Sequence, residues 1–431
     1  MRPGARLAAA VEVLDDVLSR HRPVSVALAD WGKTHRFAGS GDRSAIGNIV
    51  FDVLRRRLSL AAEMAADTPR ALVLAAAPHA LAMAPADVAV LADGSEHALS
   101  PLSDDERDRL GRGVPSHAPA NVLADLPDWL MPSLSRAFGD RLVAEGRALA
   151  ARAPVDLRAN TLKADRDKVV KALSRHGAVP AMLSPVGARI AAPHGPGRTP
   201  NVETDTAHGK GWFEVQDEAS QVAALLAGAG PRLQVMDLCA GAGGKTLALA
   251  AQMQNTGQIY AYDRDRQQLR PIFERLKRAG VRNAQVMEAG DATTLAALGA
   301  RFDVVMVDAP CTGTGTWRRR PDAKWRLKPQ MLAERIAEQQ AVLDTAAGLV
   351  KVGGRIAYVT CSLLPDENID QVRGFLERHP GFVLLHVADV WREAIGGAPP
   401  ISADGEQATL LLTPHSHGTD GFFIALLARR A

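Results

Sequence analysis

The stretch LQVMDLCAGAGGKT, residues 233–246, decides the fold of this chain. Its first part, LQVMDL (233–238), is a continuous apolar run typical of a strand buried on both faces. CAGAGGK (239–245) follows as a glycine-rich turn and leads into a helical segment. A strand, a glycine turn and a helix in this order indicate a doubly wound α/β sheet, in which the turn lies at the ligand-binding crevice.

Downstream of this stretch, strands and helices alternate along the chain. This alternation of apolar strands with helices predicts a parallel sheet. The final segment GFFIALLARR (421–430) is expected to add a last strand. The other expected strands are 258–262, 284–288, 303–307 and 355–360, with helices at about 245–253, 264–279 and 331–350.

Upstream, the pattern changes twice. Residues 1–95 carry apolar positions at helical spacing and predict a small helical domain. Residues 96–125 are rich in Gly, Pro, Ser and Asp and read as a linker. Residues 126–229 mix strand-like and amphipathic segments, which indicates a small α+β segment, and residues 230–431 hold the doubly wound domain.

Composition excludes several classes of protein. No run reaches the roughly 18 to 20 apolar residues of a membrane helix, and Glu12, Asp15 and Asp16 interrupt the first apolar stretch, which argues against a signal peptide. Three separated cysteines fit a reducing, cytoplasmic setting and leave no ligand cluster for a metal. We therefore expect a cytoplasmic protein without membrane segments or metal, and a monomer.

The net charge of +3 does not by itself indicate a nucleic-acid partner. The local distribution says more, because WRRRPDAKWRLK (317–328) holds six basic residues and one acid. A solvated loop is the plain interpretation of such a run. Its position directly after Cys311 favours contact with a polyanion near the active site.

The glycine turn and two acids predict a nucleoside-containing cofactor. Gly241, Gly243 and Gly244 allow close backbone approach and positive φ angles. Asp263, at the tip of the second strand, suits ribose hydroxyls, and Asp291 after the third strand suits an adenine edge. For each acid the structural alternative is a helix cap or a turn residue. The spacing GxGxxG is absent, which favours S-adenosylmethionine over a dinucleotide.

Two cysteines follow the fourth and fifth strands. Cys311 lies in DAPCTGTG and Cys361 in VTCSLLPDEN, and neighbouring strands would bring both thiols to the same crevice. Two buried structural cysteines are the alternative. Asp308, two positions before Pro310, gives the first thiol a polar strand-end setting in which it can be activated.

Together these stretches resemble the Sun/RsmB-type RNA (cytosine-5) methyltransferases. The resemblance covers about residues 126–431, and one departure is Ala242, where the family usually has proline. Residues 1–95 resemble a NusB-like RNA-binding domain more weakly, through DRSAIGNIVFDVLRRR. The matching stretches are FEVQDEASQ, DLCAGAGGKT, YDRD, GDA, VDAPCTGTGTWRRRPDAKW, GGRIAYVTCSLLPDEN and GTDGFF.

The resemblance implies an S-adenosylmethionine-dependent enzyme that methylates C5 of cytosine in RNA, with 16S ribosomal RNA favoured. It implies that Cys361 attacks the base, that Cys311 assists release, and that Asp308 acts at N3 of the base or on the cofactor. Transfer RNA as substrate, a non-catalytic RNA-binding assembly factor and a Rossmann oxidoreductase are the alternatives. The implied cofactor residues are Cys239, Ala240, Gly241, Ala242, Gly243, Gly244, Lys245, Asp263, Asp291 and Asp308.

Overall fold

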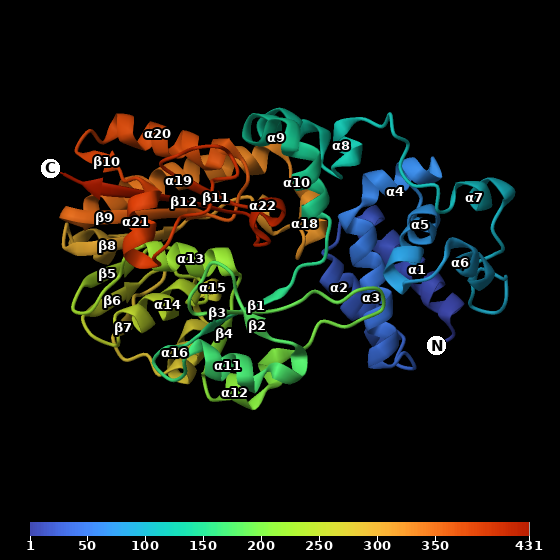
Figure 1. The fold of residues 1–431 in the computed structure, drawn as a ribbon, viewed down its shortest axis with the longest axis horizontal. Coiled ribbons are helices and arrows are strands. Elements are labelled where there is room, and N and C mark those ends of the chain that lie inside the picture. Colours follow the sequence, from blue (N-terminus) through green and yellow to red (C-terminus); the bar gives the residue numbers. More distant parts are fainter. Residues whose placement is uncertain (431) are drawn as a thin grey trace. The chain divides into compact units, whose positions relative to one another are not determined.

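The protein forms two compact units. Figure 1 shows the computed structural model, which describes residues 1–430. A helical unit comprises residues 1–153, 192–199 and 316–327. An α/β unit comprises residues 154–191, 200–315 and those from 328 onward.

The helical unit is built on α1, α3 and α5, whose apolar faces meet in one core. Leu7, Ile46 and Leu72 in this core are fully buried. Helical spacing of apolar residues in the sequence produces these faces. The helices are α1 (Pro3–Arg20), α2 (Val24–Thr34), α3 (Ser40–Arg55), α4 (Arg57–Met64), α5 (Pro69–Leu81), α6 (Pro85–Leu91), α7 (Asp104–Arg109), α8 (Ala120–Leu123), α9 (Met131–Phe138), α10 (Leu142–Leu149) and α18 (Pro321–Arg326).

This unit extends beyond the boundary at residue 95 that the sequence suggested. Residues 96–125 contain α7 and α8 rather than only loop, and Leu102 and Leu110 pack into the same core as α1 and α5. Residues 316–327, from the middle of the doubly wound region of the sequence, also belong to the helical unit. Apolar contacts between residues far apart in the sequence determine which segments belong to this unit. The local composition of the sequence does not reveal such contacts.

The α/β unit begins with a small antiparallel sheet in the order β2-β3-β1-β4. Leu157, Ile190 and Phe213 of this sheet pack with Val169 of helix α11. The strands are β1 (Val155–Ala159), β2 (Val179–Pro180), β3 (Gly187–Ile190) and β4 (Phe213–Val215), and the helices are α11 (Arg166–Ala172), α12 (Thr206–Gly209) and α13 (Glu218–Leu226).

The large sheet has the order β10-β12-β9-β8-β5-β6-β7, with β11 paired to β12. The five strands from β9 to β7 are parallel, while β10, β11 and β12 pair antiparallel. The strands are β5 (Gln234–Asp237), β6 (Gln258–Ala261), β7 (Ala284–Val286), β8 (Phe302–Asp308), β9 (Val350–Thr360), β10 (Phe382–Leu384), β11 (Leu410–Leu412) and β12 (Phe422–Arg429).

Helices cover both faces of this sheet (Figure 1). Helices α13, α14 and α21 pack on one face, where Val235, Val304 and Ile424 are buried, and α19 packs along β8 and β9 on the other. The helices are α14 (Gly244–Gln252), α15 (Arg266–Leu269), α16 (Ile272–Ala279), α17 (Ala292–Ala297), α19 (Pro329–Leu349), α20 (Ile369–Arg378), α21 (Val387–Ala394) and α22 (Pro414–His417).

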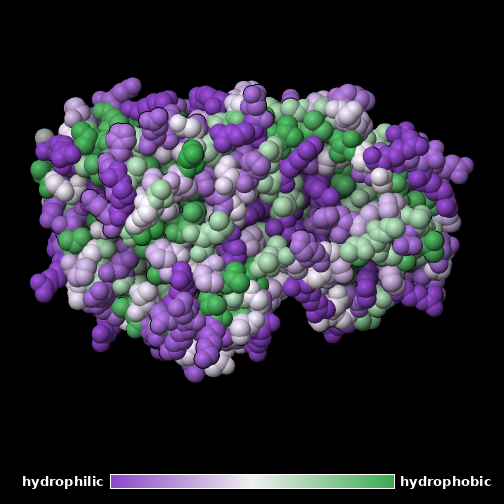
Figure 2. Space-filling model, in the orientation of Figure 1, coloured by the Kyte–Doolittle hydropathy of each residue, from purple (hydrophilic) through white to green (hydrophobic). Residues whose placement is uncertain are grey.

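The predicted fold class is confirmed: a doubly wound Rossmann-like sheet, a small α+β segment and a helical N-terminal region. Within residues 1–430, no helix has the length and apolar content that crossing a membrane requires. Figure 2 shows polar residues over most of the face in view, with apolar residues scattered among them.

Candidate active site

A cavity of about 1220 Å³ opens at the carboxyl ends of β5, β6, β8 and β9. From β5 the chain proceeds to β6 on one side of the sheet, whereas β8 pairs with β5 on the other side. This reversal of strand order is where open α/β sheets bind ligands. The cavity is therefore where the glycine turn led us to expect a site.

Most of the predicted site residues line this cavity. Gly243 does not, because its φ of +84° turns the chain into α14 and a Cβ there would lie 2.4 Å from Ile272 Cγ1. Asp291 also lies outside and caps α17, since its Oδ1 accepts from Thr294 N at 2.9 Å. The lining includes Cys239, Ala240, Gly241, Ala242, Gly244, Lys245, Asp263, Asp308, Cys311 and Cys361.

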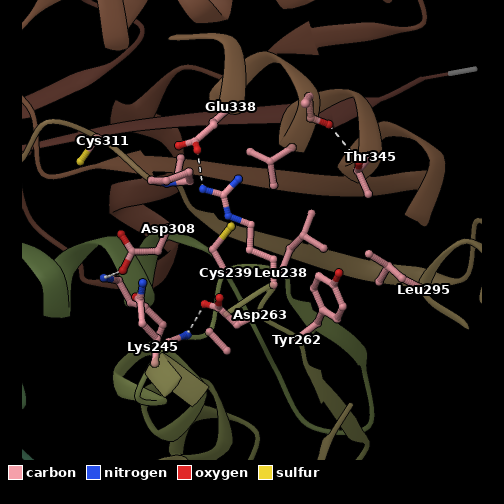
Figure 3. A pocket seen from close by; sticks show the side chains of 18 of the residues that line it. Leu238, Cys239, Lys245, Tyr262, Asp263, Leu295, Asp308, Cys311, Glu338 and Thr345 are labelled. Atoms are coloured by element: carbon pink, nitrogen blue, oxygen red, sulfur yellow. Dashed lines mark hydrogen bonds and ion pairs between the residues drawn. The ribbon is translucent and has the colours of Figure 1, made fainter. Parts of the chain in front are cut away.

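Asp263 is held by the turn that it faces. Its Oδ2 accepts from Gly241 N at 2.8 Å, and its Oδ1 accepts from Asp265 N at 2.8 Å. In Figure 3, Asp263 lies between Cys239 and Tyr262, with Leu295 beyond the tyrosine ring. A carboxylate beside an aromatic and an aliphatic side chain offers acceptors for hydroxyl groups and an apolar surface for a flat base.

Lys245 connects the turn to Asp308. Its side chain is 4% exposed, and its Nζ donates to Ser220 Oγ at 2.6 Å and to Asp308 Oδ2 at 2.9 Å. A buried ammonium requires such partners, and these two tie α14 to α13 and to the end of β8. Sequence reasoning missed Ser220, although it belongs to the quoted FEVQDEASQ stretch.

The two thiols converge as the adjacent strands predicted. Asp308 of β8 pairs with Val359 of β9, and the Sγ atoms of Cys311 and Cys361 lie 3.4 Å apart. The hydrogen bond with Cys361 and burial raise the pKa of the Cys311 thiol well above its ordinary value. The Cys311 thiol therefore holds its proton more firmly than an ordinary cysteine thiol does.

Glu367 fixes both cysteine loops and was not predicted. It is fully buried. Its Oε1 accepts from Thr312 N at 2.8 Å and from Gln339 Nε2 at 3.0 Å, and its Oε2 accepts from the Ser362 hydroxyl. Because Thr312 follows Cys311 and Ser362 follows Cys361, this one carboxyl group bridges the two loops. Burial raises its pKa.

The terminal GTDGFF stretch supports the same loops. Gly421 N donates to Gly315 O at 2.8 Å, and Gly315 N donates to Cys361 O at 3.0 Å. A Cβ on Gly315 would lie 2.2 Å from Gly421 O, so only glycine allows this approach. This contact explains why a motif at the far end of the chain accompanies the cysteine motifs.

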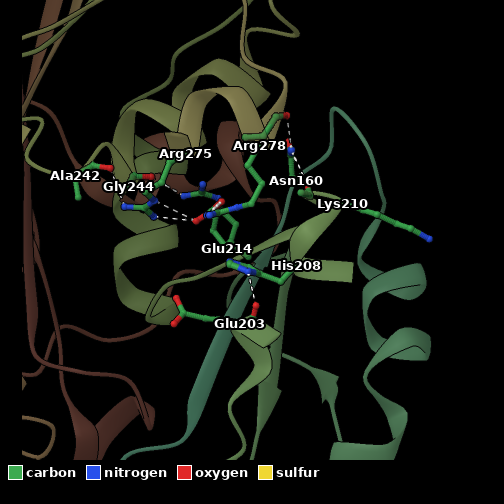
Figure 4. Close-up of polar contacts among 12 residues, drawn as sticks. Asn160, Glu203, His208, Lys210, Glu214, Ala242, Gly244, Arg275 and Arg278 are labelled. Carbon is green, nitrogen blue, oxygen red and sulfur yellow. Dashed lines mark hydrogen bonds and ion pairs between the residues drawn. The ribbon is translucent and has the colours of Figure 1, made fainter. Parts of the chain in front are cut away.

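Residues of the small sheet and of helix α16 form hydrogen bonds with backbone carbonyl groups of the glycine turn (Figure 4). Arg158 of β1 donates to Gly244 O at 2.8 Å, and Arg275 of α16 donates to Ala242 O at 2.8 Å. Glu214 of β4 forms ion pairs with Arg275 at 3.0 Å and with Arg278 at 2.6 Å. Burial lowers the pKa of Arg158 to about 10.

The basic stretch 317–328 is less available than its sequence suggested. Arg318 is 4% exposed and Lys324 is 1% exposed, and both lie in the helical unit. Lys324 Nζ donates to Arg55 O at 2.9 Å, and Trp325 Nε1 donates to Leu54 O at 2.7 Å. Lys324 and Trp325 therefore hold α18 against α3. The prediction that the run faces a polyanion is wrong for the buried Arg318 and Lys324, whereas Arg320, Arg326 and Lys328 are exposed.

Comparison with known proteins identifies the family. The family model described as 16S rRNA methyltransferase RsmB/F matches residues 225–428. The model described as the RsmF/B-like ferredoxin-like domain matches residues 126–194. The chain belongs to the RsmB/F methyltransferase family. In this RsmB/F chain the ferredoxin-like match covers β1–β3, and the methyltransferase match covers the large sheet and all three cysteines.

Individual relatives agree with this assignment. The probable ribosomal RNA small subunit methyltransferase B of Synechocystis sp. is 34% identical over 317 residues, and ribosomal RNA small subunit methyltransferase B of Pseudomonas syringae pv. tomato is 33% identical over 309. The alignments cover 70% and 71% of this RsmB/F chain and 66% of each relative, slightly under two thirds of their length.

Solved structures share the fold. The crystal structure of PH0851 matches with a TM-score of 0.73 and 27% identity, and the match covers 100% of this RsmB/F chain and 99% of the other. A structure of NSun6 from Pyrococcus horikoshii with SFG has a TM-score of 0.63 at 22% identity, which covers 72% of this chain and 100% of that one.

Proposed function

We propose that this protein is an S-adenosylmethionine-dependent RNA cytosine-5 methyltransferase that acts on 16S ribosomal RNA. The observation that carries the proposal is the pair of sulfurs, Cys311 and Cys361, 3.4 Å apart and lining the same cavity as the glycine turn. The names of the ribosomal RNA relatives support the choice of RNA, and the cysteine motifs support cytosine as the base.

The cavity suits S-adenosylmethionine in size and in chemistry. At about 1220 Å³ it is larger than most small-molecule sites, which leaves room for a base beside the cofactor. The Asp263 carboxylate suits the ribose, the turn 239–244 suits the methionine part, and Tyr262 with Leu295 suits the adenine. When bound, the cofactor supplies an electrophilic methyl group on a sulfonium.

We assign nucleophilic attack to Cys361. Addition of its thiolate to C6 of the cytosine forms the S–C6 bond, opens the C5=C6 double bond and places electron density at C5, which is otherwise a poor nucleophile. A hydrogen bond to N3 stabilises the developing charge, and we assign the Asp308 carboxyl group, carrying a proton on the oxygen that does not accept from Lys245, as the donor. The cytosine must leave its stack to reach the cavity.

We assign release to Cys311. Once C5 is substituted, its proton must leave, the C5–H electron pair re-forms the C5=C6 double bond, and the Cys361–C6 bond breaks. Cys361 leaves as a thiolate and takes the Cys311 thiol proton across the 3.4 Å between the two sulfurs. The Cys311 sulfur then takes the C5 proton, so that both cysteines end as thiols. The raised pKa of Cys311 makes its thiolate a stronger base than an ordinary cysteine thiolate.

Three cysteine variants test these roles. We expect Cys361→Ala to abolish methyl transfer from labelled S-adenosylmethionine to 16S ribosomal RNA, and Cys311→Ala to accumulate an RNA–protein adduct that survives denaturing gel electrophoresis. Cys239→Ala is the control for the adduct assay alone, since this third thiol lines the same cavity, within the turn assigned to the cofactor, and should form no lasting adduct. Full activity of Cys361→Ala would refute the assignment, and an adduct that depends on Cys311 alone would exchange the two roles.

Two alternatives remain as outcomes of further measurements. Bisulfite sequencing of total RNA from cells lacking the protein would show whether the lost 5-methylcytosine lies in ribosomal or transfer RNA. A lack of S-adenosylmethionine binding in calorimetry would favour a non-catalytic RNA-binding assembly factor.

A further inference from the structure

A second cavity, of about 430 Å³, lies wholly within the helical unit. It shares no lining residue with the cavity around the cysteines. Its polar lining is mostly basic: Arg56, Ser59, His79, Asp125, Arg147, Arg152 and His194.

Arg56 is the central observation. Its Nη2 atom is buried and has no hydrogen-bond partner among residues 1–430. Burial lowers the pKa of this guanidinium. A buried N–H group without an acceptor is unfavourable, so an anion in the cavity that accepts from Arg56 Nη2 would supply the missing hydrogen bond.

The neighbouring carboxylate, Asp52, is committed to other arginines. It accepts from Arg55 Nη1 at 2.8 Å and forms a two-bond pair with Arg152, whose Nη2 lies 2.6 Å away. Arg152 also donates to Gly195 O at 2.6 Å, which fixes its guanidinium at the cavity wall. Asp52 therefore forms no hydrogen bond with Arg56, and the arginines around it exceed its charge.

The only carboxylate in the lining, Asp125, is also satisfied. Its Oδ1 accepts from Ser59 N at 2.9 Å and its Oδ2 accepts from Ser59 Oγ at 2.7 Å. Burial raises the pKa of the Asp125 carboxyl group. Three guanidinium groups, those of Arg56, Arg147 and Arg152, thus face a cavity whose single acid is already bonded to Ser59, and Arg147 is exposed at the edge.

We propose that this cavity binds a phosphate group of the RNA, with Arg56 as the central ligand and Arg147 at the edge. Guanidinium forks match phosphate oxygens in planar two-bond contacts. The phosphate chemistry follows from the lining alone, whereas RNA as its source rests on the proposed function. Inorganic phosphate offers the same chemistry, so the experiment must separate the two sources.

The test measures binding by the full chain without S-adenosylmethionine, using a 16S ribosomal RNA transcript and inorganic phosphate as probes. Arg56→Gln and Arg147→Gln should each weaken RNA binding about tenfold, and should each reduce the slope of log affinity against log salt by about 1. Arg109→Gln is the matched control, because it removes the same charge from a half-buried arginine that is paired with Asp105 and does not line the cavity, and it should change neither quantity.

A local signal checks the position. Burial and the charge of Arg56 lower the pKa of His79, so a phosphate bound there should raise it and move the His79 C2–H resonance, assigned with His79→Gln. Arg56→Gln should remove this movement. Thermal unfolding checks that the variant folds, and the exposed Arg147→Gln provides a second test if it does not.

Two results would overturn the proposal. The first is wild-type RNA affinity and salt slope in both arginine variants. The second is binding of inorganic phosphate in the cavity, lost in Arg56→Gln, while RNA affinity is unchanged in both variants. This result would leave a site for a small anion only. Absence of methyl transfer by the wild-type protein, together with weakened RNA binding in both arginine variants, would instead count against the proposed function and leave the assignment of this cavity intact.

Discussion

At the scale of single residues, buried carboxyl groups organise the site. Glu367 accepts from the loops of both cysteines, and Asp237 at the end of β5 accepts from Thr246 Oγ1 at 2.6 Å. Neither was a predicted site residue, although both lie in quoted motifs. In a sequence an acid that braces a buried loop cannot be told from one that faces solvent.

Replacing Glu367 with glutamine should slow methyl transfer about 10- to 100-fold with little change in the KM for RNA. The variant keeps the size of the side chain, but it loses one acceptor for the donors around it and places an NH₂ group against a donor. Steady-state kinetics measures the effect. Glu274→Gln removes an exposed carboxylate of the same unit and serves as the control; equal effects of the two substitutions would contradict the bridging role.

The second prediction concerns Asp237 and pH. Burial raises the pKa of this fully buried carboxyl to about 7 from an ordinary 3.8. Between these values the folded protein keeps a proton that the unfolded chain has released, so its contribution to stability is greatest below pH 4 and declines as pH rises to about 7. By pH 8 the loss amounts to about 4 kcal/mol.

Asp237→Asn cannot ionise, so its free energy of unfolding should lose less than that of the wild type between pH 5 and pH 8. Denaturant titrations at both pH values measure the difference. Asp167→Asn, at a side chain 86% exposed, should follow the wild-type curve. A parallel decline in Asp237→Asn and the wild type would show that another group carries the pH dependence.

At the scale of elements, the glycine turn is supported by residues of a strand and a helix that do not themselves line the cavity. Arg158 of β1 and Arg275 of α16 each donate to a carbonyl of the turn. The strands β5, β6, β8 and β9 could be predicted from their apolar runs, and so could the position of the turn. These supporting arginines could not, because their partners are backbone atoms of distant segments.

Arg275→Gln should raise the Kd for S-adenosylmethionine about 3- to 30-fold, because the Ala242 carbonyl loses its charged donor and the turn loses a constraint. Isothermal calorimetry measures this. Arg278→Gln is a close control, since Arg278 pairs with the same Glu214 and has no hydrogen bond to Ala242. The proposed support fails if the two variants bind equally well.

At the scale of the whole molecule, sequence order and compact units do not coincide. Residues 316–327 lie between β8 and β9 in the sequence, yet they fold with the helical unit. Trp325 packs against the core of that unit, and the Lys324 side chain is buried there. The run was interpreted from its charge, whereas burial decides how much of that charge is accessible.

A fragment of residues 126–431 should therefore be less stable and more prone to aggregation than the full chain. Removing residues 1–125 deletes α3 and exposes Trp325 and the other apolar contacts of α18. Thermal unfolding with light scattering compares the two. Trp325→Ser in the fragment should reduce aggregation, and an unchanged unfolding temperature for the original fragment would contradict the prediction.

The sequence by itself determined the alternation of strands and helices from β5 to β9, the position of the glycine turn and the two strand ends that carry Cys311 and Cys361. These follow from local periodicity and from the geometry of parallel sheets, which place strand ends at one edge. Only the tertiary structure decided that Asp263 lines the cavity while Asp291 caps a helix, and that Glu367 joins the cysteine loops. It also decided that Arg56 Nη2, at a second cavity, has no hydrogen-bond partner among residues 1–430. The physical reason is that burial and partnership arise from contacts between distant segments, which a linear pattern does not contain.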